Sequence, residues 1–395
     1  MRIIKVLTPL ALAALLAACS NGDELTTETI VVGNSDVEVK LAAGSSNITR
    51  ASVESSDDSL FQITGKDKLG IFMLATYKKG VNPTEDDINW TASGVDQWSV
   101  WINNDSANAV NNGVVTDIQW AKAGQKYYYP IGNWYSYRFY GYYPRVDAIN
   151  YSADQVSADF TGLDGTKDVI WGRSLGANPN GTADEQCRYS AQYFRMAGFS
   201  GKYPSLDLNH KMMRIQFYVQ GLEDEDAEAG HKYDKANEMM VDTIEVLNVP
   251  TTATLIVADR TTEENNGKIR YDWVNNLSNI GILGAADGAF DKAASRVNNN
   301  NQIAIGQPML LPVLDADATA AGTTKYMVNV TLRNTAGEVF KAERPLDLVA
   351  PNEFEAGKTY KVVLKIAGPK LVVMKATLAP WQPANEGAID DLIFN

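Results

Sequence analysis

The sequence has almost no cysteine and almost no histidine, and these shortages exclude most of the usual catalytic and metal-binding sites. Its 395 residues contain two cysteines, Cys19 and Cys187, and two histidines, His210 and His231. Because Cys19 lies in the N-terminal export signal described below, no disulfide is expected within the mature chain. Paired zinc ligands, a Gly-x-Ser-x-Gly turn, phosphate-binding loops and dinucleotide fingerprints are missing from the sequence. We therefore expect no enzyme, no metal and no cofactor.

Basic residues are scarce relative to acidic ones. The chain has 35 Lys and Arg against 48 Asp and Glu, a formal net charge of −13. This excess argues against partners such as nucleic acid. The apolar run near the N-terminus is too short to span a bilayer, and Pro9 interrupts it.

The first nineteen residues have the pattern of an export signal. Arg2 and Lys5 form a basic start, an apolar run follows, and Leu-Ala-Ala stands directly before Cys19. This ending is similar to a bacterial lipobox, in which Cys19 is lipidated and becomes the new N-terminus, and the acidic residues 20–24 resemble the export signal of Bacteroidetes surface lipoproteins. We expect residues 1–19 to be the lipoprotein signal that ends at the lipobox, cut in front of Cys19, and the mature chain to be anchored in the outer membrane through Cys19. The alternative is an ordinary signal peptide with an incidental cysteine.

Residues 20–50 are predicted to form a leader with one removable strand. Charged and apolar residues alternate over 36–41, the pattern of a strand with one buried face. The buried face would carry Val37, Val39 and Leu41. Small polar residues then lead to Arg50, so the sequence predicts an accessible cleavage point between Arg50 and Ala51.

Downstream of the leader, the pattern is one of strands separated by turns. Strands are expected over residues 68–75, 135–142, 206–219, 242–249, 253–257, 308–314, 325–332, 358–366 and 371–378. Only residues 285–295 have the character of a short helix. The predicted fold class is all-β, most simply two sandwich domains over 51–203 and 204–395, with the boundary near Pro204.

Several tryptophans lie within one span that is partly loop, including Trp90, Trp98 and Trp101. Exposed aromatic rings are platforms on which a sugar ring stacks, and this leaves a glycan-binding surface lipoprotein as an alternative function. The reading that we favour is that these rings bury large areas at the ends of a sandwich core.

Several short segments stand in a characteristic order along nearly the whole chain. They are the lipobox at Cys19, Thr-Arg-Ala at 49–51, Gly-Lys-Asp-Lys-Leu-Gly-Ile-Phe at 65–72, Arg-Phe-Tyr-Gly-Tyr-Tyr-Pro at 138–144, Leu-Asn-His-Lys-Met-Met-Arg-Ile at 208–215, Phe-Glu-Ala-Gly-Lys-Thr-Tyr at 354–360, and Trp381. In order and spacing they resemble the fimbrillin family of Bacteroidales, the subunits of type V pili. The resemblance implies two transthyretin-like β-sandwich domains, lipoprotein export, and polymerisation after proteolysis. The implied partners are other fimbrial subunits, an Arg-specific protease and a surface ligand.

The leader fits this resemblance. A cut at Arg50 would remove a strand from the first domain and open an apolar groove with unpaired backbone edges, which a strand from a neighbouring subunit would fill. In the family the donor comes from the C-terminal region, where two candidates stay open. One is the tail 388–395, and the other is a strand whose apolar positions are Val372, Met374, Ala376 and Leu378. Whether the chain is an anchor, stalk or tip subunit also stays open.

Overall fold

The regular secondary structure in the computed structural model of the chain is almost entirely β, which confirms the predicted all-β class. It describes residues 34–44, 61–63, 66–78, 88–91, 98–111, 116–131, 135–174, 189–195, 203–229, 231–282, 301–348, 354–379 and 392–394. The helical elements among them are short: α1 (Ala191–Arg195), α2 (Asp234–Asn237), α3 (Ala316–Ala320) and the 3-10 turn η3 (Glu263–Asn265). None of the described helices is long and apolar enough to cross a membrane. Cys19, Arg50, Ala51 and the expected helix over 285–295 lie outside the described residues.

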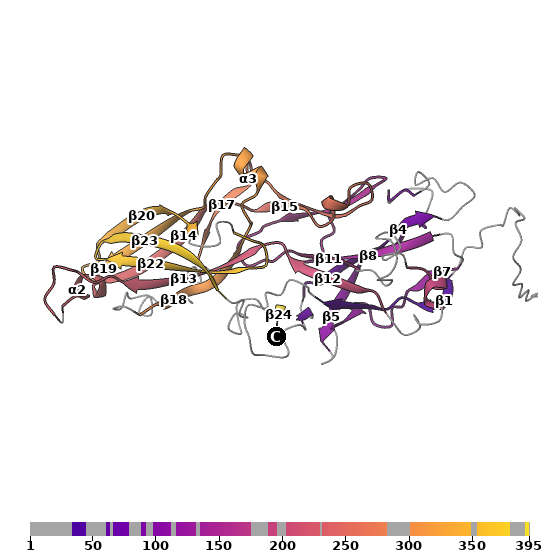
Figure 1. Ribbon diagram of the computed structural model, residues 1–395, viewed down its shortest axis with the longest axis horizontal. Coiled ribbons are helices and arrows are strands. Elements are labelled where there is room, and N and C mark those ends of the chain that lie inside the picture. The colour runs from indigo at the N-terminus through magenta and orange to yellow at the C-terminus, as the bar shows by residue number, and fades with distance from the viewer. Residues whose placement is uncertain are drawn as a thin grey trace, which may run out of the picture.

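The molecule is elongated, and the largest sheet lies in the half that carries the N-terminal strands (Figure 1). Its strands, in spatial order, are β24 (Leu392–Phe394), β3 (Phe61–Ile63), β5 (Val100–Asn111), β4 (Leu69–Lys78), β8 (Tyr135–Tyr143), β11 (Ile170–Ser174), β12 (Ser205–His210), β2 (Leu41–Gly44) and β6 (Thr116–Trp120). β5 also pairs with β6, from Ala107 with Trp120 to Asn111 with Thr116. The strands from β5 round to β6 therefore close into a ring, which we call the barrel.

Two smaller sheets lie beside the barrel. One pairs β1 (Asn34–Glu38) with β7 (Tyr128–Pro130), and the other runs in the order β16 (Ile269–Tyr271), β15 (Thr252–Asp259), β10 (Gln155–Thr161) and β9 (Ile149–Tyr151). The aromatic strand β8 is buried on both faces because it lies between such layers. The Tyr142 ring contacts Phe160 of β10 at 6.1 Å between centroids, whereas Phe139, on the opposite face, contacts Tyr129 at 6.2 Å.

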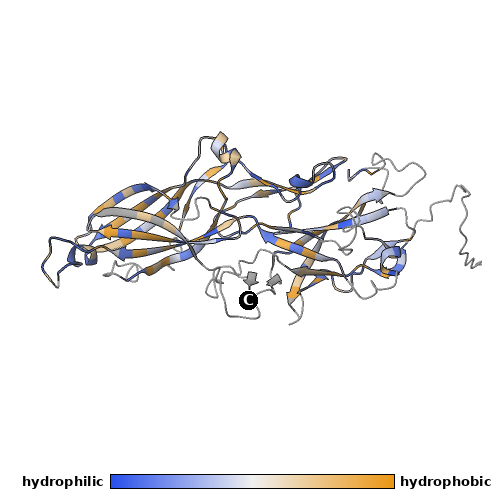
Figure 2. Ribbon diagram, in the orientation of Figure 1, coloured by the Kyte–Doolittle hydropathy of each residue, from blue (hydrophilic) through white to orange (hydrophobic). Residues whose placement is uncertain are grey.

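The other half of the molecule contains two sheets. The first has the order β18 (Ile303–Leu311), β13 (Met213–Gly221), β22 (Thr359–Ala367), β23 (Lys370–Ala379) and β21 (Asp347–Leu348), and the second has the order β17 (Leu277–Gly281), β14 (Met239–Pro250), β19 (Met327–Asn334) and β20 (Val339–Pro345). Apolar and polar residues alternate along these strands (Figure 2). Along β13 and β22 the alternation matches burial, as expected for strands with one face in a core.

The strand expected over 206–219 is in fact two strands in different sheets, so that prediction was wrong. The chain bends at Lys211 and Met212, which carries it from β12 in the barrel to β13 in the five-stranded sheet. Backbone hydrogen bonds fix the bend: Lys211 N donates to the Val169 carbonyl at 2.7 Å, and Gly357 N donates to the Met212 carbonyl at 2.8 Å. Apolar and polar residues alternate in the same way before and after the bend. The bend therefore cannot be recognised from the sequence pattern.

A second connection between the halves is made by the hairpin of β15 and β16. β15 follows β14 in the chain, yet it pairs with β10 from Gln155 with Asp259 to Thr161 with Thr252. In Figure 1, β15 lies between the two halves of the molecule. Strands that follow Pro204, namely β12, β15, β16 and β24, therefore lie in sheets with strands that precede it.

Candidate assembly interface

The leader strand β2 is an internal strand of the barrel. It runs parallel to β12, with Ala43 opposite Leu206, and antiparallel to β6, with Leu41 opposite Ile118. Ala42 N also donates to the Pro204 carbonyl at 2.9 Å. Within the barrel, β2 is thus the strand that joins β12 to β6, and we call the gap it fills the leader seat.

The leader is not one continuous strand over 36–41. β1 ends at Glu38 and pairs with β7, and β2 begins at Leu41 in the barrel. The change of partner occurs where Val39 N donates to the Tyr127 carbonyl at 2.8 Å. The alternation still holds across the break, because side chains at every second position point to the same side.

Three leader side chains fill the leader seat. The exposed fractions of Val39, Leu41 and Ala43 are 2%, 3% and 6%. Val37 is half-buried and packs against the same core. Burying a Val or Leu side chain contributes about 1.5–3 kcal/mol, so the leader is part of the hydrophobic core of this chain.

The outer part of the leader is bound by charge. Glu38 lies 3.4 Å from Lys126 Nζ, and Asp36 forms an ion pair with Arg195 of α1. The hydrogen bond from Arg195 lowers the pKa of the Asp36 carboxyl. Sequence reasoning missed Lys126 and Arg195, because each is far along the chain from its partner and neither stands in a recognisable motif.

The two candidate donor segments have different surroundings. β23 pairs with β22 along its whole length, from Thr359 with Ala379 to Ala367 with Lys370, and β21 pairs on its other side. Met374 and Ala376 in β23 are buried, whereas the side chains of Val372 and Leu378 lie outside the described residues. In the tail, β24 pairs with β3 over three residues.

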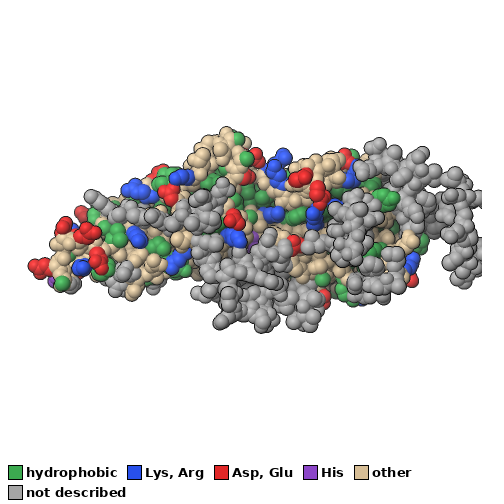
Figure 3. Space-filling view, viewed as in Figure 1, with side chains coloured by type: hydrophobic (Ala, Val, Ile, Leu, Met, Phe, Trp, Pro, Cys, Tyr) green, Lys and Arg blue, Asp and Glu red, His purple; other side chains and the backbone are tan. Residues whose placement is uncertain are grey.

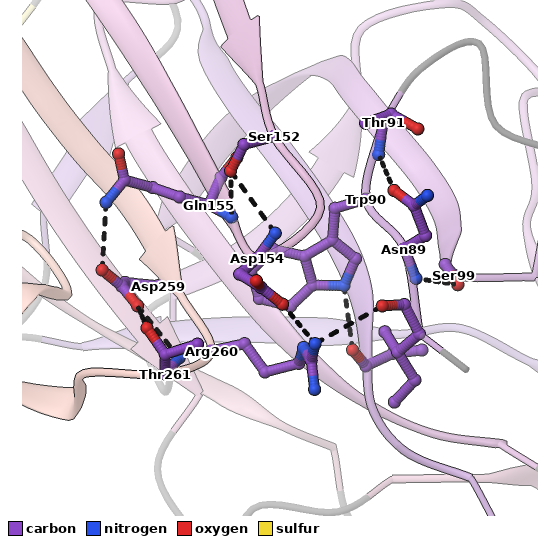
Figure 4. Close-up of polar contacts among 12 residues, drawn as sticks. Asn89, Trp90, Thr91, Ser99, Ser152, Asp154, Gln155, Asp259, Arg260 and Thr261 are labelled. Atoms are coloured by element: carbon purple, nitrogen blue, oxygen red, sulfur yellow. Dashed lines mark hydrogen bonds and ion pairs between the residues drawn. The ribbon is translucent and has the colours of Figure 1, made fainter. Parts of the chain in front are cut away.

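The tryptophans considered for glycan stacking lie in or against the core. The Trp90 side chain is fully buried, and its indole N–H donates to the Ala75 carbonyl at 2.9 Å (Figure 4). Trp98 is 9% exposed, and its ring stacks on that of Trp101 at 5.3 Å and on that of Tyr135 at 6.4 Å. Trp101 is half-buried and donates to the Tyr128 carbonyl at 2.8 Å. In this arrangement Trp90 has no free face for a sugar ring.

A polar cluster lies where β15 ends beside β10 (Figure 4). The buried Asp259 carboxylate accepts hydrogen bonds from Gln155, Thr261, Thr262 and Asn265. Next to it, Arg260 forms an ion pair with Asp154. Since the lone pairs of Asp259 are taken by protein donors, the cluster fixes the turn after β15.

Charges of both signs are dispersed over the described residues of one face of the molecule (Figure 3). On the face shown in Figure 3, acidic and basic side chains are interspersed, with acidic side chains at the end that carries α2. Within the described part of the chain, no group of three or more His, Cys, Asp or Glu side chains is placed to hold a metal ion.

Comparison with known proteins identifies the family to which the chain belongs. The sequence profile of the fimbrillin-like family matches residues 49–381. No curated protein matches the chain. Similar solved structures include a candidate cell adhesion protein from Bacteroides uniformis (15% identity, 89% of this chain and 100% of that chain, TM-score 0.47) and another from Bacteroides ovatus (13%, 91% and 100%, 0.45). The fimbrial anchor protein Mfa2 from Porphyromonas gingivalis is also similar (9%, 83% and 90%, 0.32).

The solved structures are too distant to carry an argument, whereas the family profile covers most of the chain. It confirms the resemblance found in the sequence. The chain therefore belongs to the fimbrillin-like family: it is a subunit of a cell-surface fimbria, with other fimbrial subunits as its partners, and not an enzyme.

Proposed function

We propose that the chain is made as a lipoprotein anchored to the outer membrane through Cys19 and that an Arg-specific protease cuts it after Arg50. The cut separates β1 and β2 from the rest of the chain, which we call the body. The emptied leader seat then accepts a strand from a neighbouring subunit. The family match begins at residue 49, next to the proposed cut, and leaves β1 and β2 outside the matched region.

The observation that carries this proposal is the position of β2 between β12 and β6. Without β2, both neighbours would have an unpaired backbone edge, and the sites of Val39, Leu41 and Ala43 would face solvent. Apolar burial of about 1.5–3 kcal/mol per large side chain and backbone hydrogen bonds near 1 kcal/mol each would then favour an incoming strand. β-Strand addition of this kind gives a lasting joint between subunits.

The pairing of the C-terminal segments bears on which one is donated. β23 lies between two strands and would expose β22 and β21 if it left. The tail strand β24 lies at the edge of its sheet and pairs only with β3 in the described part of the chain. Release of the tail would therefore break fewer hydrogen bonds than release of β23.

Proteolysis of residues 20–395, produced without the lipid, tests the proposal. Mass spectrometry after treatment with an Arg-specific protease should show a cut at Arg50, and sizing should show detergent-resistant oligomers. Arg50→Ala should remain uncut there and monomeric, while Arg344→Ala, at an exposed arginine of β20, should behave as the unchanged chain. A clean cut at Arg50 that leaves a stable monomer in all conditions would contradict assembly by strand exchange.

A further inference from the structure

The leader neutralises two basic side chains of the body. Arg195 of α1 pairs with Asp36, and Lys126, which precedes β7, pairs with Glu38 at 3.4 Å. Among the described residues, no other carboxylate lies within ion-pair distance of either cation. Arg195 and Lys126 together form what we call the basic rim of the leader seat.

The charged residues of the leader and its buried apolar residues lie in different parts of the leader. Asp36 and Glu38 both belong to β1, which pairs with β7 outside the barrel, and each meets a cation of the body. The apolar residues Val39 and Leu41 follow directly and enter the barrel core. The Asp105 carboxylate accepts the Tyr127 hydroxyl at 2.7 Å and, among the described residues, forms no ion pair with Lys126 or Arg195. Removal of the leader therefore takes away the carboxylates that pair with the basic rim.

From this we infer that the leader seat selects its occupant by charge as well as by shape, and we call this its charge selectivity: the occupant is a strand of a neighbouring subunit that carries a carboxylate directly ahead of its apolar residues. The inference rests on the proposed strand exchange. Two cations beside the entrance attract an acidic strand and disfavour a basic one. Because both ion pairs are exposed to solvent, each should change affinity by about 1.5- to 5-fold.

The two C-terminal candidates differ in this respect. β23 contains Lys370 and Lys375 but no carboxylate. The tail has Asp390 and Asp391 directly before Leu392. In the register that places Leu392 and Phe394 at the sites of Val39 and Leu41, Asp391 takes the place of Glu38 beside Lys126. Asp390 then falls at the Val37 position and Ile389 at that of Asp36, so the tail supplies one of the two carboxylates. The basic rim therefore favours the tail of a second copy of this chain.

Peptide binding tests this charge selectivity when the peptides are present while the full chain is cut at Arg50, so that they compete with assembly. Labelled peptides spanning residues 34–44, with the native sequence or with Asp36→Asn and Glu38→Gln, are compared by fluorescence anisotropy. At low ionic strength the native peptide should bind about 2- to 25-fold more tightly than the neutral one. The ratio should fall toward one in about 1 M salt, where exposed charges are screened.

Charge reversal separates a direct contact from a general charge effect. A body with Lys126→Glu and Arg195→Glu should prefer a peptide with Asp36→Lys and Glu38→Lys. Lys122→Glu, at an exposed lysine between β6 and β7, is the matched control and should keep the native preference. Equal binding of the native and neutral peptides, or no reversal in the double variant, would overturn the charge selectivity of the leader seat while leaving strand exchange intact. Failure of every peptide to bind to a cut chain that has lost its leader and stays monomeric would instead refute strand exchange, and the charge selectivity with it.

Discussion

Trp171 in β11 donates its indole N–H to the carbonyl oxygen of Val257 in β15 at 2.9 Å, which ties the barrel to a strand 86 residues further along the chain. The turn after β15 adds ion pairs, since Glu263 contacts Arg138 at 3.2 Å and also pairs with Arg173. The two halves of the molecule are therefore joined both by the chain, where it bends from β12 into β13, and by side-chain contacts from the hairpin of β15 and β16.

The contact between Gly267 and Trp171 predicts a large effect of a small substitution. Gly267 has φ +75°, and a Cβ there would overlap the Trp171 ring. Gly267→Ala should lower the free energy of unfolding by about 2–4 kcal/mol, from backbone strain and overpacking together. The control is Gly337→Ala, where φ is +87° but nothing lies within 4 Å of the added Cβ, and about 1 kcal/mol is expected. Equal losses in urea unfolding would show that the ring contact is unimportant.

Leu41 should stabilise the uncut chain although it belongs to the leader. It is 3% exposed and lies opposite Ile118. Leu41→Ala should cost about 2–5 kcal/mol in the uncut chain and should speed release of the leader after cleavage. Lys40→Ala, at an exposed neighbour, should cost less than about 0.5 kcal/mol. Denaturant unfolding and the rate of leader release measure both effects, and unchanged values for Leu41→Ala would mean that the leader seat is not filled in solution.

Asp259 should make stability depend on acid pH. Burial raises the pKa of its carboxyl, but hydrogen bonds from Asn265, Thr262, Gln155 and Thr261 outweigh burial and lower the pKa from 3.8 to about 2. Because the folded pKa lies below the unfolded one, the stabilisation is present above about pH 4 and is lost as the pH falls toward 2. A shift of this size corresponds to about 2 kcal/mol.

Asp259→Asn should therefore lower stability at pH 7 by about 2 kcal/mol and flatten its decline between pH 4 and 2. The control is Asp147→Asn, whose side chain is 89% exposed and should matter by less than about 0.5 kcal/mol. Thermal unfolding across this pH range measures both. A wild-type curve that is flat between pH 4 and 2 would contradict the low pKa of Asp259.

Trp90 should behave as a core residue. Trp90→Phe keeps an aromatic ring but removes the hydrogen bond to the Ala75 carbonyl, so a loss of about 1–3 kcal/mol is expected. Trp120→Phe is the comparison, because the Trp120 side chain is half-buried and its ring meets Tyr127 edge-on at 4.8 Å, and a smaller loss is expected. Reduced binding on a sugar array with unchanged stability would instead support the glycan-binding alternative.

Local patterns predicted many strands because side-chain alternation depends only on neighbouring residues. The ranges expected over 242–249, 325–332 and 358–366 overlap β14, β19 and β22. The same reasoning failed between β12 and β13, where the bend depends on hydrogen bonds to distant residues. It also did not show that β8 is covered on both faces, because aromatic residues suit either surroundings.

The sequence by itself determined the all-β class, the family and the alternation of Val37, Val39 and Leu41 in the leader. Only the tertiary structure decided that β2 lies between β12 and β6 and that Asp36 meets Arg195, 159 residues away. The physical reason is that burial patterns follow from the period of the backbone. Strand order and ion pairs depend on which distant segments the folded chain brings together.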